Sequence, residues 1–437
     1  MELAGTILFG VVGGLGLFLY GMQLMGGSLQ KVAGRKLEKI IGLLTTNRFM
    51  GVFVGAFVTA VMQSSSATTV MVVGFVNAGI MKLTQAVGVI MGANIGTTIT
   101  GQIVSLSIDD IAPLSVGIGM FVWIMSKSDR VKNIAEIMIG LGILFIGMGM
   151  LKDSLKPLRE LEYFNTLITT LSHNALLGVL VGFMLTFIVQ SSSASISILI
   201  ALASAGALPL SAALPILYGD NIGTCTTALL SSIGASKNAK RAAIIHLAFN
   251  VIGTLIFVVF LTRPITYIVT QIDPVAVQRQ IANAHTIFNI ANVVIQFPFA
   301  FFLVKFALWV YPDSKEEEKE KITKYIDDRL LGLPSTAINS TREEIIHMGW
   351  VAHESLTHAM NGYFDKNEKE IDQTYALELK VNHFERVITD YMIKLSNCEL
   401  SDYDRSYVDG LFHCVNDVER IGDHADNIAE IAIATIE

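Results

Sequence analysis

The chain has 437 residues, of which 52% are hydrophobic and 16% are charged, and its formal net charge is −7. Soluble domains carry about 25% charged residues, so this composition, with a mean hydropathy of +0.55, excludes an ordinary soluble protein and indicates a membrane protein. Three cysteines without disulfide or metal-ligand spacing exclude a fold that depends on disulfide bridges.

Charge is distributed unevenly along the chain. Residues 1–311 hold 18 Lys and Arg and 11 Asp and Glu, whereas residues 312–437 hold 13 and 27. The sparse first region predicts a membrane domain, whose partner is the lipid bilayer, and the dense, acidic second region predicts a domain in water. No nucleic-acid partner is expected.

The first region contains stretches that are apolar and long enough to cross a bilayer, which takes about 20 residues. Leu3–Gly26 is predicted to be a retained first span, because it lacks the basic n-region and the cleavage site of a signal peptide. Two uncharged stretches rich in Gly, Ser and Thr, 49–81 and 163–219, are each predicted to contain a hairpin that enters the membrane and returns. Further spans are predicted at 84–106, 111–126, 134–151, 242–262 and 286–310.

The two uncharged stretches carry the same motifs at an offset of 127 residues. The sequence QSSSA occurs at 63–67 and 190–194, and GANIGTT at 92–98 matches GDNIGTC at 219–225. The match predicts two repeat copies, at about 13–106 and 140–233. Three crossings precede the second copy if the hairpin does not cross, so this copy is expected to be inverted, which is a recurrent plan of transporters.

A serine triplet at a hairpin turn offers hydroxyls beside the free N–H groups of a helix N-terminus, a combination that attracts anions. Two such turns would form a neutral cradle suited to a tetrahedral oxyanion such as phosphate. The same segments supply oxygen ligands for a hard cation. The alternative is that these small residues serve helix packing. A nucleophilic serine enzyme is not expected, because no base and orienting acid accompany either triplet. The candidate oxygen ligands are Gln63, Gln190, Thr68, Thr69, Ser195, Ser197, Asn94, Thr97, Asn221 and Thr224.

The paired QSSS and GxNIGT motifs resemble the type II sodium-dependent phosphate cotransporter family, over about residues 1–310. The resemblance implies an all-α, polytopic transporter of two inverted repeats, with each QSSS in a re-entrant hairpin, which carries phosphate and co-transported sodium by alternating access. It implies phosphate contacts by Ser64, Ser65, Ser66, Ser191, Ser192 and Ser193, to which we add Asn94 and Asn221. It implies sodium ligation by Gln63, Gln190, Thr68, Ser195 and nearby threonines, which we take as Thr69, Thr97 and Thr224.

Single residues add to this expectation. Asp220 is the only acid between Glu162 and Lys237 and stands where the first copy has Ala93. It is a candidate for sodium or proton binding, or for a hydrogen bond to a protonated phosphate, and the alternative is an acid that reaches the membrane interface at a helix end. Asp109 and Asp110 are expected at the water-exposed end of a span, and the alternative is that they hold an additional sodium ion. The His-x-x-Phe-Asn patterns at 246–250 and 285–289 are expected to support the hairpins through buried hydrogen bonds, and the alternative is that they line the transport path.

The second region begins with a charged linker at 312–340, and amphipathic patterns predict helices at 341–364, 366–397 and 401–435. They indicate a soluble three-helix bundle at 341–437. The sequence VERIGDHADNIAE at 418–430 resembles PhoU-like regulatory domains, which implies a cytoplasmic location. It also implies a divalent or trivalent metal at Glu419, Asp423 and Asp426, against the alternative of solvated acids. One three-helix unit is present where full PhoU proteins have two, so a truncated domain is expected. The candidate partners of this domain are a second copy of the chain and a regulatory protein.

The expected function is sodium-coupled symport of phosphate across a cell membrane, by a multi-pass protein of the prokaryotic cytoplasmic membrane. The alternatives are a symporter of another oxyanion, proton coupling, a phosphate sensor and a passive channel. Concentrative uptake would be seen with a symporter of another oxyanion or with proton coupling, but not with a phosphate sensor or a passive channel.

Overall fold

The computed structural model describes residues 2–44, 47–106, 108, 110–312, 323–332, 334–398 and 400–436. These residues form helices and connecting turns and contain no β-strand. The chain divides into two compact units, Met1–Val73 with Lys82–Pro312, and Gly74–Met81 with Asp313–Glu437. The predicted all-helical fold class is therefore confirmed.

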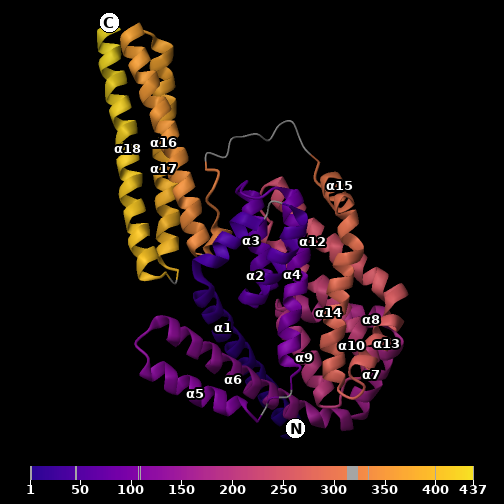
Figure 1. Ribbon diagram of the computed structural model, residues 1–437. Helices are drawn as coiled ribbons and strands as arrows, with labels where there is room; N and C mark the ends of the chain where they lie inside the picture. The colour runs from indigo at the N-terminus through magenta and orange to yellow at the C-terminus, as the bar shows by residue number, and fades with distance from the viewer. Residues whose placement is uncertain are drawn as a thin grey trace. The chain divides into compact units, whose positions relative to one another are not determined.

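The first unit contains the apolar helices (Figure 1). Their bounds are α1 (Glu2–Leu44), α2 (Arg48–Met62), α3 (Ser65–Asn77, whose last residues belong to the second unit), α4 (Leu83–Val104), α5 (Ala112–Met125), α6 (Asp129–Leu155), α7 (Glu162–His173), α8 (Ala175–Val189), α9 (Ser192–Ser204), α10 (Leu210–Gly223), α11 (Cys225–Ser231), α12 (Lys237–Ile256), α13 (Thr262–Ile272), α14 (Val277–Gln296) and α15 (Ala300–Val310).

Five stretches of the described residues are helical, long and apolar enough to cross a membrane. They are Ile7–Ala33, Leu83–Val104, Asp129–Glu160, Lys237–Ile272 and Val277–Val310. Each contains or closely overlaps a predicted span. The predicted span at 111–126 is the shorter helix α5, whose 14 residues reach about 21 Å at 1.5 Å per residue. It is too short to cross the hydrocarbon core of about 30 Å by itself, because Pro113 stands at its start and Ser126 ends it.

The two uncharged stretches each form a pair of short helices around the glutamine of QSSS. Helices α2 and α8 have 15 residues and α3 and α9 have 13. In the first pair the Thr59 hydroxyl donates a hydrogen bond to the Thr68 hydroxyl over 2.9 Å. A continuous helix would separate these residues by about 13 Å along its axis. The chain therefore folds back at Gln63, and α2 and α3 form a helical hairpin.

The packing of α1 against α6 shows that the two copies are inverted. These helices occupy equivalent places in the copies, since Phe18 and Phe145 match at the 127-residue offset. Gly14 lies against Gly147 and Gly21 against Gly140, so the helices run antiparallel (Figure 1). Equivalent helices that pack antiparallel are related by a two-fold axis perpendicular to them. The copies are therefore inverted, as predicted, although the count of crossings behind that prediction included the span at 111–126, which α5 is too short to form by itself.

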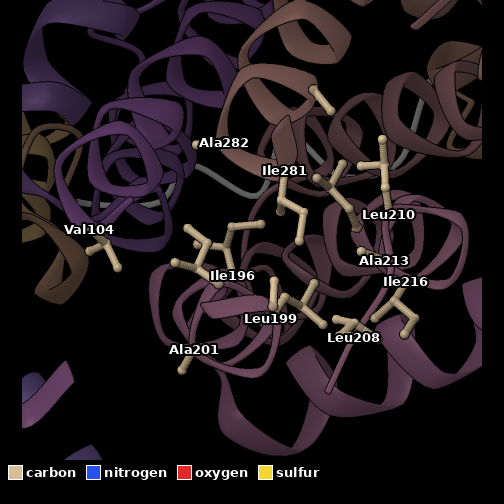
Figure 2. Packing of buried hydrophobic residues seen from close by; sticks show 14 of the residues in the cluster. Val104, Ile196, Leu199, Ala201, Leu208, Leu210, Ala213, Ile216, Ile281 and Ala282 are labelled. Carbon is tan, nitrogen blue, oxygen red and sulfur yellow. The ribbon is translucent and has the colours of Figure 1, made fainter. Parts of the chain in front are cut away.

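The core of the first unit is a cluster of apolar side chains. Figure 2 shows Ile196 and Leu199 of α9, Ala213 and Ile216 of α10, and Ile281 of α14 in this cluster. All five side chains are buried, and they fix α9 against α10 and α14. The second hairpin helix is thus held in place by packing on its apolar face, which leaves its serine-bearing N-terminus to be positioned by polar contacts.

The second unit contains the three long helices α16 (Pro334–Asp365), α17 (Glu368–Ser396) and α18 (Asp402–Ile436), which run side by side (Figure 1). The predicted helices are present, and the first begins at Pro334, earlier than expected. Within the predicted linker, the buried carboxylate of Glu344 accepts hydrogen bonds from the backbone N–H groups of Lys324, Tyr325 and Ile326. Residues 313–322 of that linker lie outside the described residues.

Candidate functional site

Gln63 and Gln190 stand at the turns of the two hairpins in the same unusual backbone conformation. Their φ angles are 53° and 56°, in the left-handed region that non-glycine residues rarely adopt. Each residue thereby ends one helix (α2 or α8) and starts the reversal. The Gln63 side chain is buried and that of Gln190 is exposed. Strained backbone of this kind persists where the surrounding structure over-determines it, as at binding sites.

The serine triplets begin the second helix of each hairpin. The first serine caps that helix, because Ser64 Oγ accepts a hydrogen bond from Ala67 N over 3.1 Å and Ser191 Oγ accepts one from Ala194 N over 3.3 Å. The second serines meet, with 3.5 Å between Ser65 Oγ and Ser192 Oγ. Since these two residues are 127 apart, their contact lies on the pseudo-two-fold axis. The structure therefore brings the two predicted phosphate segments together.

Thr100 of α4 joins the two hairpins and was not among the predicted residues. Its hydroxyl donates to Gln63 Oε1 over 3.0 Å and accepts from Ser193 Oγ over 3.4 Å. Thr227, its equivalent in the second copy, donates to the carbonyl of Thr224 in its own helix. The sequence offered a weak signal, since Thr100 lies one helical turn beyond Thr97. It is buried and links Gln63 of one copy to the triplet of the other.

The other predicted ligands are buried, Thr68 and Thr69 in α3 just after the first turn and the GxNIGT residues in α4 and at the end of α10. The side chains of Asn94, Thr97, Asn221 and Thr224 donate hydrogen bonds to carbonyl groups of their own helices, and so do those of Thr68 and Thr69, to Ser64 and Ser65. Ser66 is half-buried and carries the carbonyl that accepts a second bond from Thr69. Their hydroxyl and amide oxygens retain lone pairs, which a cation requires of a neutral ligand.

Asp220 is completely buried in α10, so the interpretation of an acid that reaches the interface is wrong. Asp110 is exposed, as expected for a helix end, whereas Asp109 lies outside the described residues. His246 and His285 are buried, and the Nδ1 atoms of both rings have no hydrogen-bond partner among the residues that the structure describes. The amides of Asn250 and Asn289 donate to the carbonyls of those histidines within their helices.

The predicted metal ligands of the C-terminal region are not gathered into a metal cluster among the residues that the structure describes. Glu419, Asp423 and Asp426 lie on one side of α18, and among the residues that the structure describes no three His, Cys, Asp or Glu side chains converge as metal ligands. The pKa of Glu419 is raised, mainly by partial burial and further by the carboxylates of Asp423 and of Glu385 in α17. The arrangement is a repulsive acidic surface, in line with the alternative of solvated acids.

Glu419→Gln is expected to stabilise the C-terminal helices. The folded state raises the pKa of this acid, so its ionisation weakens folding as the pH rises from the unfolded pKa through the folded pKa. The variant should therefore raise the Tm by about 1 °C near pH 7.5 and leave it unchanged near pH 4. Thermal unfolding of the full chain at both pH values measures this effect, with Asp417→Asn, exposed on the same helix, as the control. An equal shift at both pH values would contradict the electrostatic cause.

The family model described as Na+/Pi-cotransporter matches the chain twice, over residues 17–153 and 150–273. The chain belongs to the Na+/Pi-cotransporter family. The two matches fall on the two repeat copies, and the PhoU domain model matches residues 345–432. Both resemblances noted from the motifs are thereby confirmed.

Relatives of this Na+/Pi-cotransporter chain come from bacteria and animals. It is 24% identical to the candidate inorganic phosphate export protein YjbB of Salmonella typhimurium over 88% of this chain and 70% of the relative. It is 30% identical to the uncharacterised protein YqeW of Bacillus subtilis over 64% of this chain and 91% of the relative. It is 34% identical to the sodium-dependent phosphate transport protein 2A of Rattus norvegicus over 22% of this chain and 15% of the relative. No solved structure matches the chain.

Membership of the Na+/Pi-cotransporter family supports phosphate transport, with phosphate and sodium as the substrates of the family. Together with the apolar helices, it shows a multi-pass membrane protein.

Proposed function

We propose that the chain is a symporter that couples sodium to phosphate and holds phosphate between its two QSSS hairpins. The observation that carries this proposal is the 3.5 Å approach of Ser65 Oγ to Ser192 Oγ on the pseudo-two-fold axis. One ligand at that point contacts both copies at once. A tetrahedral oxyanion matches the arrangement, because its oxygen acceptors can receive hydrogen bonds from both hydroxyls when it lies to one side of the pair.

The charge of the site suits binding followed by release. Helices α3 and α9 begin at the triplets and direct their N-terminal dipoles and N–H groups to the same region. Neither uncharged stretch contains Lys or Arg. Phosphate is therefore held by neutral hydrogen-bond donors, and sodium supplies the positive charge that makes binding favourable. Two ligands that each improve the affinity for the other are thermodynamically coupled.

We assign sodium to oxygen atoms around the triplets. The hydroxyls of Thr68, Thr97 and Thr224 donate their protons to carbonyl groups, so each points lone pairs away from its own helix. Hard cations take such oxygen ligands. The proposed set in this region is Gln63, Gln190, Thr68, Thr69, Thr97 and Thr224.

The two hairpins differ in exposure, and this difference supports alternating access. The Gln63 side chain is 6% exposed, whereas the side chain of its equivalent Gln190 is exposed. Inverted copies in unequal conformations produce the opposite-facing state when they exchange conformations. We infer that the structure represents a state in which the Gln190 side of the site is the open one.

The energetics allow transport in either direction, set by the gradients. Two sodium ions with one divalent phosphate move no net charge, so a tenfold sodium gradient supplies about 2.8 kcal/mol, enough for about hundredfold accumulation. A third sodium ion would add about 1.4 kcal/mol from the same gradient and about 2.3 kcal/mol per 100 mV of membrane potential. The name of the YjbB relative refers to export, so the direction is part of the test.

The test is uptake of radiolabelled phosphate into proteoliposomes that contain the full chain. We expect accumulation above equilibrium with an inward sodium gradient, and none with potassium or a proton gradient in its place. An outward sodium gradient should drive phosphate out of loaded vesicles. Saturable binding without accumulation would replace the symporter by a sensor, and accumulation driven by protons alone would contradict sodium coupling.

Thr100→Val is expected to raise the KM for phosphate about tenfold, because it removes the hydroxyl that positions Gln63 and Ser193. The loss of two neutral hydrogen bonds of about 0.5–1.5 kcal/mol each corresponds to this range. Thr227→Val is the matched control, since it removes only a bond within its own helix. Initial uptake rates of both variants at saturating sodium give the comparison. Equal KM values for the two variants would show that Thr100 does not position the site.

A further inference from the structure

The last residues of α3 belong to the C-terminal unit. Helix α3 begins at the first serine triplet, in the first unit, whereas its residues from Gly74 onward are part of the compact unit that contains the long C-terminal helices. There the Asn77 amide donates a hydrogen bond to the Asp327 carboxylate. The buried side chain of Leu330 lies over Gly74, since a methyl group added to this glycine would be 3.1 Å from Leu330 Cδ2. One helix therefore connects the proposed phosphate site to the C-terminal unit.

Residues 323–332, which we call the bracket, are fixed to the long C-terminal helices. The backbone N–H groups of residues 324–326 donate hydrogen bonds to the buried carboxylate of Glu344 in α16. The Tyr391 hydroxyl of α17 donates to the carbonyl of Asp327 over 3.0 Å. Asp327 is thus bound through its carbonyl to α17 and through its carboxylate to the end of α3. The bracket therefore joins the end of α3 to two helices of the C-terminal unit.

The hairpin helix of the second copy, α9, ends in a different environment. Ala201 and Ser204 of α9 stand where α3 has Gly74 and Asn77. Ala201 is buried in the apolar cluster of the first unit (Figure 2). At the equivalent position α3 lacks the methyl group, and the side chain of Leu330 lies there instead. The end of α9 is therefore held by the first unit, whereas the end of α3 is held by the C-terminal unit.

We propose that the bracket is an autoinhibitory contact, through which the C-terminal unit holds the first hairpin closed and slows transport. This inference rests on the proposed function, because it assigns a regulatory role to one of the same two hairpins. The turn of the first hairpin is closed in this structure, where the Gln63 side chain is 6% exposed. Opening that turn moves α3, a single helix of 13 residues that is about 20 Å long.

The bracket acts on movement and not on phosphate binding. Asn77 lies at the opposite end of α3 from Ser65, so the bracket takes no part in holding phosphate. A contact that is made in only one of two conformations stabilises that conformation. The bracket contacts therefore favour the closed first hairpin, and their loss should allow the copies to exchange conformations faster.

Two substitutions release the bracket, and both are measured in the full chain. Asn77→Ala should raise the Vmax of sodium-driven phosphate uptake about three- to tenfold, the range for one lost hydrogen bond, and Leu330→Ala should raise it at least as much. Both should also speed hydrogen exchange of the backbone amides at residues 61–68, which is measured without transport. Ser204→Ala changes the position of α9 that is equivalent to Asn77 and should match the unaltered protein. Folded release variants in which neither Vmax nor exchange rises would overturn the proposal.

A reversible cross-link tests the same contact without weakening it. Asn77→Cys and Asp327→Cys are introduced together, with Cys398→Ser and Cys414→Ser, and the new pair is joined by a short bis-thiosulfonate reagent. The joined protein should take up phosphate about tenfold more slowly or less, regain its rate with dithiothreitol, and still bind phosphate at equilibrium. The protein with only the two serine substitutions is the control. Uptake that continues at the unjoined rate would show that the C-terminal unit moves with the hairpin, and would overturn the proposal.

The outcomes separate this inference from the symport itself. If uptake is driven by sodium but neither the release variants nor the cross-link changes its rate, the autoinhibitory contact is wrong while sodium-coupled transport stands. If the unaltered protein shows no sodium-driven uptake, the proposed function fails. Hydrogen exchange at residues 61–68 then decides on the bracket alone, since faster exchange in both release variants supports a restraint on the first hairpin and equal exchange contradicts it.

Discussion

Ser65→Ala and Ser192→Ala are each expected to raise the KM for phosphate ten- to hundredfold while leaving the protein folded. Each substitution removes a hydroxyl donor from the place where the two hairpins meet, 3.5 Å from its symmetry partner. Hydrogen bonds to charged groups contribute about 1.5–3 kcal/mol, and each 1.4 kcal/mol is a factor of ten. Initial rates of sodium-driven uptake in proteoliposomes against phosphate concentration measure the effect.

The pair of variants also tests the symmetry of the site. In the proposed site both serines contact one phosphate, so the two single variants should have similar KM values. The KM of the double variant should rise by less than the product of the two single increases. Ser211→Ala is the control, since this serine is exposed at the start of α10. An unaltered KM in both single variants, with protein that is folded, would remove the serines from the phosphate site.

Gly182→Ala is expected to prevent the protein from folding. A methyl group at this position would lie 1.9 Å from the carbonyl oxygen of Ile216, so α8 and α10 would have to move apart. Gly55→Ala in the first copy should have the same result, because its methyl group would lie 2.1 Å from the carbonyl oxygen of Val89. Backbone atoms cannot move aside for the added methyl group as the end of a flexible side chain can. Close packing of membrane helices on small residues is what holds these pairs together.

Size-exclusion chromatography and thermal unfolding of detergent-solubilised protein measure this loss. Gly149→Ala is the matched control, because this glycine lies in α6 and, beyond its own helix, no atom of the described residues lies within 4 Å of the added methyl group. It should fold normally and be slightly more stable, since alanine favours helix by about 1 kcal/mol. A monodisperse, folded Gly182→Ala protein would show that α8 and α10 are not packed as closely as described.

The positions of the two hairpins were predictable because both repeat copies carry the same motifs. The offset of 127 located both hairpins, and the packing of Gly21 against Gly140 shows the inversion. The count of crossings reached the same inversion only by including the span at 111–126. The span at 111–126 was misjudged because hydropathy does not reveal that Pro113 and Ser126 bound a helix of 14 residues.

The site was predictable only where both copies carry the same residue. Ser65 and Ser192 meet as their pattern suggested. Thr100 was missed because its hydrogen bonds cross between the copies, which no periodicity encodes. The burial of Asp220 could not be predicted from the sequence either, since it depends on the close approach of α8 and α10. The metal ligands expected near Glu419 stay a prediction, because motif spacing alone does not show whether ligands converge, and no such cluster is found among the described residues.

The most direct test of the shared phosphate site is equilibrium binding of radiolabelled phosphate to purified protein at increasing sodium concentrations. We predict that one phosphate binds per chain, that its affinity rises with sodium, and that both Ser65→Ala and Ser192→Ala weaken it. Two phosphates per chain, or binding that neither substitution affects, would contradict a single site between the two hairpins.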